Sequence, residues 1–182
     1  MGSHGGATAA GQVALLAHYQ ITETSMGVPI LSSMEAAEIG KTEDGVPVYV
    51  DKHALEADQI IVVNRIKPHT KFKAPIESGL MKMMAIGMGK QKGADYYHKA
   101  ALHYTFYKII VDAGREVLKK TPVLCGLGTV ENGYDETAMI VGLRPEEIER
   151  EEEKLLILIR CQVETNYPRP SRNALDAAGI GG

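Results

Sequence analysis

Positive charge and two histidines gather in the middle of the sequence, between Asn64 and Ala100. This segment holds seven lysines and one arginine, but only two acidic residues, Glu77 and Asp95. Glycine lets a backbone approach a ligand closely, while lysine offers charge to an anion. The segment also contains the glycines Gly79, Gly87, Gly89 and Gly93. Together these residues predict a site for a phosphate or a carboxylate, although any one lysine alone is typical of a solvated loop.

Two common phosphate-binding patterns do not fit this segment. The phosphate loop GxxxxGK[ST] would need a glycine at Met84 and a serine or threonine at Gln91. The dinucleotide pattern GxGxxG also fails, because the third glycine of "GMGKQKG", Gly93, comes one position late. The nearby aromatic residues lack the spacing of a base-stacking platform. The sequence therefore favours a small anion over ATP, a dinucleotide or a nucleic acid.

Three histidines are candidates for acid–base chemistry or for metal binding. His69 follows an apolar run, at the end of a predicted buried strand, and open α/β sheets bind ligands at that edge. His98 lies on the helix predicted after the glycine loop, and His4 lies in a glycine-rich turn before another helix. Imidazole titrates near neutral pH and ligates metals, so we expect these three side chains to face one cleft. The remaining histidines are interpreted as structural or solvent-exposed residues: His18, His53 and His103.

Strand and helix signals alternate around these residues. Apolar spacing predicts a helix over residues 8–19 with Thr8 as its N-cap. A β-hairpin is predicted between residues 35–39 and 46–50, because the Asp44-Gly45 pair can supply the positive φ values that a tight turn needs. The run "QIIVVN" predicts a central strand buried on both faces. Later signals predict helices over residues 94–102 and 105–120, strands in "TPVLCGLGTVE" and "ETAMIVGL", and a helix from Pro145. The predicted fold is α/β, with a central, mostly parallel, Rossmann-like sheet flanked by helices.

Length and composition limit the remaining possibilities. The 182 residues suit one domain of ordinary size, 45% of them are hydrophobic, and no apolar run is long enough to span a membrane. The net charge of −3 argues against a surface built for nucleic acid. Two isolated cysteines, Cys125 and Cys161, indicate neither a disulfide framework nor a zinc site. We therefore expect a cytoplasmic protein with reduced thiols and with neither a membrane nor a nucleic acid as partner.

The order of four motifs resembles the nickel-dependent lactate racemase family. These motifs are "GSHGGAT", "EADQIIVVNRIKPHTKF", "IESGLMKMMAIGMGKQKGA" and "YYH". The resemblance extends over most of residues 2–143. It implies that the chain corresponds to the latter part of that family's N-terminal catalytic domain. It implies a domain over residues 1–160 whose start is missing, followed by a tail or a cut linker over residues 161–182.

The resemblance also implies a cofactor and its ligands. The family's cofactor is a nickel pincer nucleotide, a pyridinium mononucleotide whose two sulfur-containing arms hold nickel through carbon and sulfur. By motif position, His4 and His69 match the two catalytic acid/bases, and His98 matches the histidine that completes the coordination of nickel. Lys82 stands where the founding enzyme attaches a lysine to the cofactor. The "IESGLMK" stretch departs from the founding enzyme here, so covalent and non-covalent binding both stay open.

Further cofactor contacts and partners follow from the same resemblance. Ser78 and Gly79, beside Lys82, are candidate cofactor-binding residues. The family's substrate-binding arginine would lie upstream of Met1, and its cleft-closing C-terminal domain has no counterpart here. We therefore expect a fragment that holds no cofactor and is inactive until that domain is restored.

Two functions remain in competition. The resemblance implies racemisation or epimerisation of a small 2-hydroxy acid by hydride transfer, with the two histidines as acid/bases and the substrate unspecified. The alternative is a non-enzymatic anion- or nucleotide-binding α/β domain, in which His69 and His98 only stabilise the loop.

Overall fold

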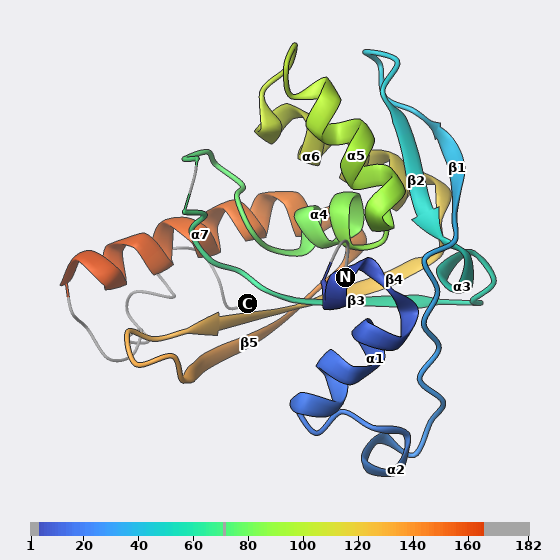
Figure 1. Ribbon diagram of the computed structural model, residues 1–182. Coiled ribbons are helices and arrows are strands. Elements are labelled where there is room, and N and C mark those ends of the chain that lie inside the picture. The colour runs from blue at the N-terminus through green and yellow to red at the C-terminus, as the bar shows by residue number, and fades with distance from the viewer. Residues whose placement is uncertain (1–3, 71, 166–182) are drawn as a thin grey trace. The chain divides into compact units, whose positions relative to one another are not determined.

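The computed structural model (Figure 1) describes residues 4–70 and 72–165. These residues divide into two compact units. Unit 1 takes its residues from the stretch before Gln59 and from Met84–Thr121, and unit 2 takes the rest. Strands and helices occur in both units, so the predicted α/β class is confirmed. Of the predicted tail, residues 161–165 continue the last helix, and residues 166–182 lie outside the described part.

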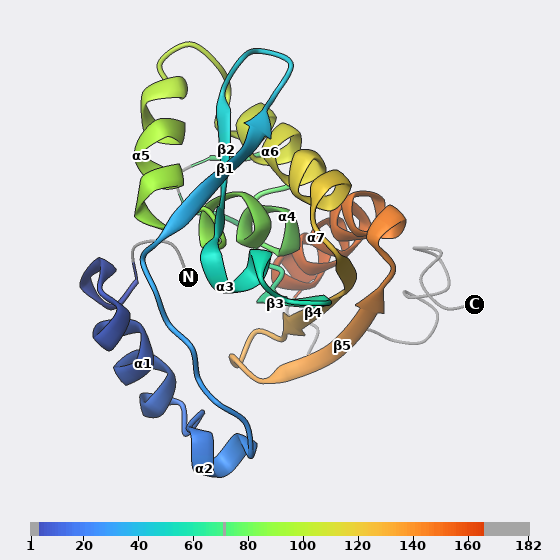
Figure 2. The ribbon, with the colours of Figure 1, turned by 90° about the vertical axis from the view of Figure 1, so that its right-hand side faces the viewer.

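Unit 1 contains a β-hairpin, and three of the unit's helices pack against it (Figure 2). Its strands, β1 (Ala36–Lys41) and β2 (Pro47–Asp51), pair antiparallel as predicted. In the turn, the Gly45 amide donates to the Thr42 carbonyl over 2.9 Å, and Gly45 takes a φ of 79°. Glycine adopts this φ without a steric penalty. Gly45 alone, and not the Asp44-Gly45 pair, therefore supplies the positive φ that the turn needs.

Threonine side chains cap the start of several helices in unit 1. α1 (Ala9–His18) follows Thr8, whose hydroxyl accepts a hydrogen bond from the Gly11 amide over 3.0 Å, so the predicted N-cap is confirmed. α6 (Phe106–Lys120) follows Thr105, which caps it in the same way. The other elements of unit 1 are η1 (Gly5–Ala7), α2 (Glu23–Met26), α3 (Lys52–Leu55) and α5 (Lys90–Ala100). The hairpin and the helices share a core that includes the fully buried residues Val48, Val50, Tyr97, Ile110 and Val117.

Three strands form the sheet of unit 2, in the order β3-β4-β5. β3 (Ile60–Arg65) pairs parallel with β4 (Val123–Glu131), and β4 pairs antiparallel with β5 (Thr137–Leu143). The sheet is therefore mixed, and the predicted mostly parallel, Rossmann-like arrangement is wrong for the described residues. The physical reason is local, because only a tight turn separates β4 from β5, and so short a connection joins only antiparallel strands.

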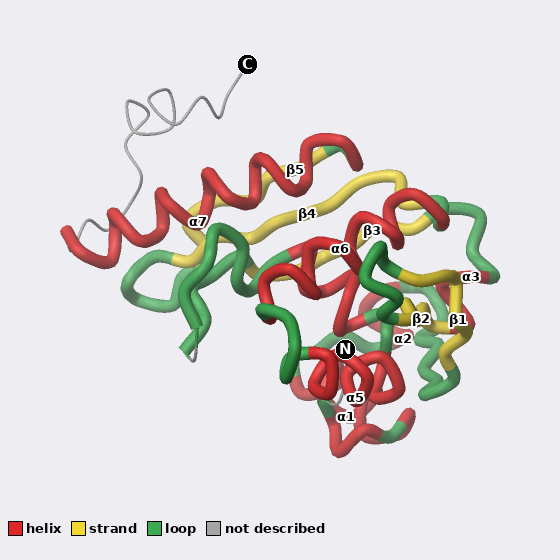
Figure 3. The backbone as a smooth tube through the Cα atoms, turned by 90° about the horizontal axis from the view of Figure 1, so that it is seen from above, coloured by secondary structure: helices red, strands yellow, loops and turns green. Residues whose placement is uncertain are grey.

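β3 lies at the edge of this sheet and not at its centre, contrary to the prediction. Val62 is buried, whereas its neighbours Ile61 and Val63 are 52% and 55% exposed. Successive side chains of a strand point to opposite faces, and among the described residues of unit 2 the covering helices lie on one face. These helices are α4 (Leu80–Lys82) and α7 (Ile148–Thr165), and α7 runs along the sheet (Figures 1 and 3).

Glycines on β4 let these helices approach the sheet closely. An added Cβ at Gly126 would lie 2.7 Å from Leu80 Cδ1 and 3.2 Å from Ile148 Cδ1. Both of these side chains are fully buried, so neither has free space into which to move. The absence of a side chain at Gly126 therefore sets how closely α4 and α7 pack on β4.

We expect the Gly126→Ala substitution to lower the free energy of unfolding by about 1 to 3 kcal/mol, the usual cost of overpacking a core. Urea unfolding followed by circular dichroism measures this change. Gly142→Ala on β5 is the matched control, because its Cβ would meet Leu127 Cδ2 at 3.7 Å, an ordinary contact. Equal stabilities of the two variants would contradict the packing argument.

Candidate functional site

The predicted site residues divide between the two units. His69, Ser78, Gly79 and Lys82 belong to unit 2, and His4 and His98 belong to unit 1. In unit 2 the four residues lie on one continuous stretch between β3 and the end of α4. The convergence of His4, His69, Lys82 and His98 on a single pocket stays a prediction.

The loop that carries His69 begins and ends beside the carboxyl end of β3. The Lys67 amide donates to the Ser78 carbonyl over 2.8 Å, which forms an isolated antiparallel bridge. The Asn64 side-chain amide donates to the Gly79 carbonyl, also over 2.8 Å. The two ends of the loop are thus joined, and Ser78 and Gly79 lie where the loop returns to the sheet.

A buried carboxylate organises the interior of this loop. Glu77 is 1% exposed and accepts hydrogen bonds from the backbone amides of His69, over 2.6 Å, and of Ala74, over 2.8 Å. The guanidinium of Arg160, on α7, forms an ion pair with the same carboxylate. Sequence reasoning did not give Glu77 or Arg160 a role. The available signal was an acidic residue inside an otherwise basic loop.

Lys82, at the end of α4, is half-buried. Burial lowers the pKa of its ammonium group, and the positive charge of Lys67 lowers that pKa further. Both effects favour the neutral amine, which is the nucleophilic form of lysine. Directly after Lys82 the chain forms a π-helical segment, η2 (Met83–Gly87), and such segments are frequent at functional sites.

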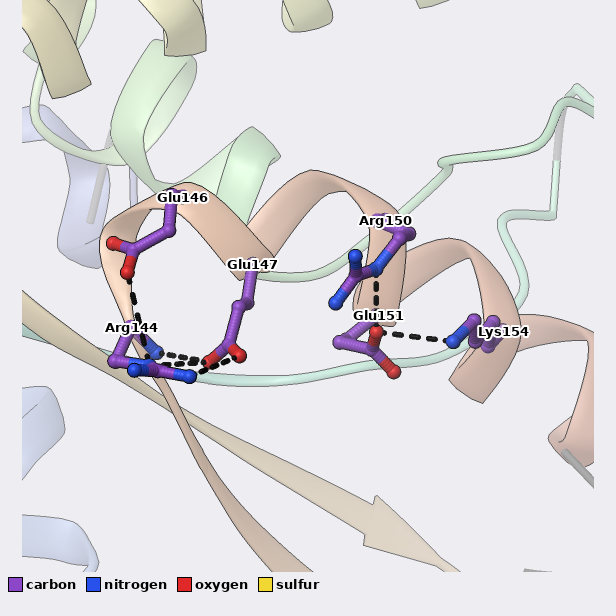
Figure 4. A network of polar contacts seen from close by, with 6 residues as sticks. All are labelled: Arg144, Glu146, Glu147, Arg150, Glu151 and Lys154. Atoms are coloured by element: carbon purple, nitrogen blue, oxygen red, sulfur yellow. Dashed lines mark hydrogen bonds and ion pairs between the residues drawn. The ribbon is translucent and has the colours of Figure 1, made fainter. Parts of the chain in front are cut away.

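Two adjacent glutamates on α7 show opposite electrostatic behaviour. Burial by itself would raise the pKa of Glu151, but hydrogen bonds from Arg150 and Lys154 outweigh it and lower that pKa. Figure 4 shows this network, together with the Arg144 contacts at η3 (Pro145–Glu147), the turn that precedes α7. Glu152 lies outside this network, and burial raises its pKa to about 7.

The carboxyl group of Glu152 packs against the stretch that carries Gly79 and Lys82. One of its oxygens accepts a hydrogen bond from the Met81 amide over 2.9 Å, and the other has no hydrogen-bond partner within the described part of the chain. A Cβ at Gly79 would lie 2.4 Å from that second oxygen. Gly79 therefore has a packing reason to be glycine, apart from any contact with a ligand.

The glycines around His4 and before His98 also have local reasons. Gly5 and Gly6, after His4, take φ values of 65° and 66°, the left-handed region that favours glycine. A Cβ at Gly89 would lie 2.5 Å from the Ala85 carbonyl oxygen. α5 begins at Lys90, so part of the predicted glycine loop is helical, and close packing explains this glycine without a ligand.

The two predicted site histidines of unit 1, His4 and His98, are both exposed. His4 immediately precedes η1, and its carbonyl accepts a hydrogen bond from the Gln12 side chain over 3.4 Å. His98 lies on α5 next to the fully buried Tyr97, and its ring stacks on the Phe106 ring at a centroid distance of 6.0 Å. The burial of Tyr97 therefore sets the orientation of α5, in which the neighbouring residue His98 is exposed to solvent.

A buried polar chain connects the His4 turn to the start of α5. Lys90 is 8% exposed and forms an ion pair of 2.8 Å with Asp51, which also caps α3. Its ammonium also donates to the Gln12 side-chain oxygen over 3.3 Å, and Gln12 in turn holds His4. Lys90 takes a φ of 54°, which costs free energy for a residue other than glycine. The contacts of its side chain offset that strain.

Protein side chains alone do not form a metal site in the described residues. There is no group of three or more histidines, cysteines, aspartates or glutamates close enough to hold a metal ion in residues 4–70 and 72–165. Among the helices of the same ranges, none has the length and apolar character needed to cross a membrane.

Replacing Glu152 by glutamine should remove a pH-dependent loss of stability. Because the folded-state pKa is raised to about 7, the folded protein holds a proton that the unfolded chain releases near 4.5, and the free energy of unfolding falls by about 3 kcal/mol between these values. Glu152→Gln stays uncharged and should flatten this part of the curve. Glu153→Gln, at the exposed neighbouring position, is the control. Urea unfolding at pH 4.5 to 8 measures the effect, and parallel curves for wild type and Glu152→Gln would contradict it.

Replacing Lys90 by methionine should leave Asp51 buried without its cation. We expect the free energy of unfolding to fall by about 3 to 5 kcal/mol, the cost of breaking a buried ion pair. Adding Asp51→Asn to this variant should restore part of the loss. Lys119→Met, at an exposed position near the end of α6, should change stability by less than about 0.5 kcal/mol. Urea unfolding measures all three, and a similar loss in Lys119→Met would contradict the assignment.

Comparison with known proteins identifies the family of this chain. No curated protein matches the sequence. The family model of the lactate racemase N-terminal domain matches residues 1–106, which is more than half of the chain. This range contains His4, His69, Lys82 and His98, whereas β4, β5 and α7 lie beyond it. The chain therefore belongs to the lactate racemase N-terminal domain family.

Proposed function

We propose that this chain is part of the catalytic domain of a racemase or epimerase of 2-hydroxy acids that uses a nickel pincer nucleotide. The observation that carries the proposal is that one family model covers the motifs of His4, His69, Lys82 and His98 in order. The proposal includes a C-terminal domain that completes the cleft, and a location in the cytoplasm. The sequence holds only two cysteines, Cys125 and Cys161, and neither lies in a CxxC pair, which suits a reducing compartment.

The donor groups of the chain suit such a cofactor. A nickel ion already held by the carbon and sulfur ligands of the cofactor would need only one further imidazole, which a single histidine can supply. The exposed His98 is the residue that would supply this nitrogen. The half-buried Lys82, with its lowered pKa, is the amine that would hold or bond an arm of the cofactor. Lys67 and other lysines of the loop would neutralise its phosphate.

The cofactor, when bound, supplies a hydride acceptor, and this avoids the unfavourable carbanion that removal of the α-hydrogen as a proton would form. The chain's own part is proton transfer and orientation. His69 takes the hydroxyl proton of one enantiomer as the α-hydrogen leaves with its electron pair. His4 returns a proton to the oxygen for the opposite enantiomer, so two bases serve the two faces of the intermediate ketoacid. Basic side chains hold the carboxylate of the substrate during the exchange.

The alternative role, in which His69 only stabilises its loop, has less support. The loop is held through the backbone amide of His69, the carboxylate of Glu77 and the pairing of Lys67 with Ser78. A backbone amide is available from any residue except proline. These contacts do not use the imidazole of His69, whose ring packs against the ring of Phe72. Proton transfer is the role that we propose for the imidazole.

We expect His69→Asn to lower turnover by about 100-fold or more, because it removes a general acid/base, without loss of bound nickel. The protein should be produced from its full reading frame together with the enzymes that make the cofactor. Nickel content, absorbance in the near ultraviolet and visible range, and interconversion of 2-hydroxy acid enantiomers are then measured. His103→Asn, at an exposed position between α5 and α6, is the matched control.

A deuterium label distinguishes the proposed chemistry from proton abstraction. A 2-hydroxy acid deuterated at the α-carbon should keep its label through racemisation in ordinary water, because hydride does not exchange with solvent. Washout of the label would contradict hydride transfer. If the protein produced together with the cofactor-making enzymes contains no nickel and has no absorbance in the near ultraviolet and visible range, the proposal as a whole is contradicted and the anion-binding alternative is favoured.

A further inference from the structure

The loop of His69 depends on a cation from outside the family-matched segment. Arg160 lies on α7, beyond residue 106, where the match to the family ends. Its guanidinium pairs with Glu77 and also donates to the Ala74 carbonyl over 3.2 Å. Arg160 thus holds the loop at a side chain and at the backbone, and both contacts lie within unit 2.

The burial of Glu77 makes these contacts necessary. A carboxylate that is 1% exposed has lost its hydration, which is unfavourable unless opposite charge and hydrogen bonds replace the water. The amides of His69 and Ala74 and the guanidinium of Arg160 supply this replacement. Removal of the cation would leave a buried charge held by two amides, and the loop would open to hydrate it.

The same contacts restrict the position of the imidazole. The backbone of His69 is fixed by its amide, which donates to Glu77 over 2.6 Å, and the ring of His69 packs against the ring of Phe72 at a centroid distance of 4.5 Å. Beyond this, the pairing of Lys67 with Ser78 fixes the loop ends to the sheet. An imidazole held at its backbone and at one ring face has few accessible orientations.

We propose that Glu77 and Arg160 are positioning residues for His69. The ion pair holds the loop so that the imidazole has one orientation. Helix α7, which carries Arg160, therefore contributes to the function of His69, although the family match does not extend to this helix. This inference rests on the proposed function, in which His69 transfers the hydroxyl proton.

Hydrogen exchange tests the positioning without the cofactor. In Arg160→Met, the amides of His69 and Ala74 should exchange roughly 10- to 100-fold faster, the equivalent of one charge-assisted hydrogen bond, while the amides of β4 stay as in wild type. Arg150→Met, an exposed arginine of the same helix that pairs with Glu151, is the matched control and should leave both amides unchanged. Arg160→Lys, which keeps the charge, should give an intermediate rate.

Kinetics on the loaded protein test the consequence for His69. Arg160→Met should lower kcat by roughly 10- to 100-fold with KM within about threefold of wild type, because substrate binding is kept and the orientation of the acid/base is lost. Arg160→Lys should recover part of kcat, and Arg150→Met should equal wild type. A purely structural role would change the unfolding midpoint but not kcat at a temperature where the variants remain folded.

Two results would overturn the inference. Unchanged exchange of the His69 and Ala74 amides in Arg160→Met would show that Arg160 does not hold the loop. Faster exchange of these amides together with a wild-type kcat would show that the loop conformation does not affect catalysis by His69. Should Arg160→Met not fold, the same comparisons apply to Arg160→Lys. A loaded wild type without racemase activity would instead refute the proposed function itself, and this outcome is recognisable because it appears before any substitution is made.

Discussion

The buried carboxylate of Glu77 is the constraint on which the predicted site of unit 2 depends. The basic segment around it would by itself be an extended, self-repelling loop, since its charges have the same sign. One acidic residue, buried and bound by two amides and by Arg160, turns this stretch into a defined loop. His69 and Ser78 owe their positions to it, because the first follows a fixed amide and the second lies at the fixed loop end.

A second buried carboxyl group, that of Glu152, lies behind the same stretch and behaves differently. It has no cation within the described part of the chain, and burial favours its protonated form. Two glutamates thus support one segment by two means. Glu77 is paired with a cation and accepts two amide hydrogen bonds, whereas burial raises the pKa of Glu152 to about 7. The lowered pKa of Lys82 belongs to the same environment, in which burial disfavours charge wherever no partner compensates.

Unit 1 follows the same principle with a cation at its centre. Lys90 accepts an unfavourable backbone conformation and burial, and the pairing with Asp51 and Gln12 compensates both. Gln12 links Lys90 to the carbonyl of His4, and Lys90 is itself the first residue of α5, the helix that carries His98. This polar chain therefore joins the turn of His4, the predicted acid/base, to the start of the helix that carries His98, the predicted nickel ligand. In both units, ionic groups that sequence reasoning left aside support the residues that it selected.

The sequence by itself determined local structure and the family. Apolar spacing and capping residues predicted α1, α6, the β-hairpin and the strands β3, β4 and β5, because these signals act over a few residues. The motifs predicted the family, and the family match contains all the predicted acid/base and metal-binding residues. The role of Gly79 could not be separated from ligand binding, because its nearest neighbour, Glu152, is far away in the sequence.

Only the tertiary structure decided pairing and burial. The edge position of β3 depends on which strands meet, and a continuous apolar run does not say how many of its faces are covered. The partnership of Glu77 with Arg160 joins residues that are distant along the chain, and so does that of Lys90 with Gln12. Charge at a position can be read from the sequence, but whether water or an opposite charge compensates it depends on the folded environment.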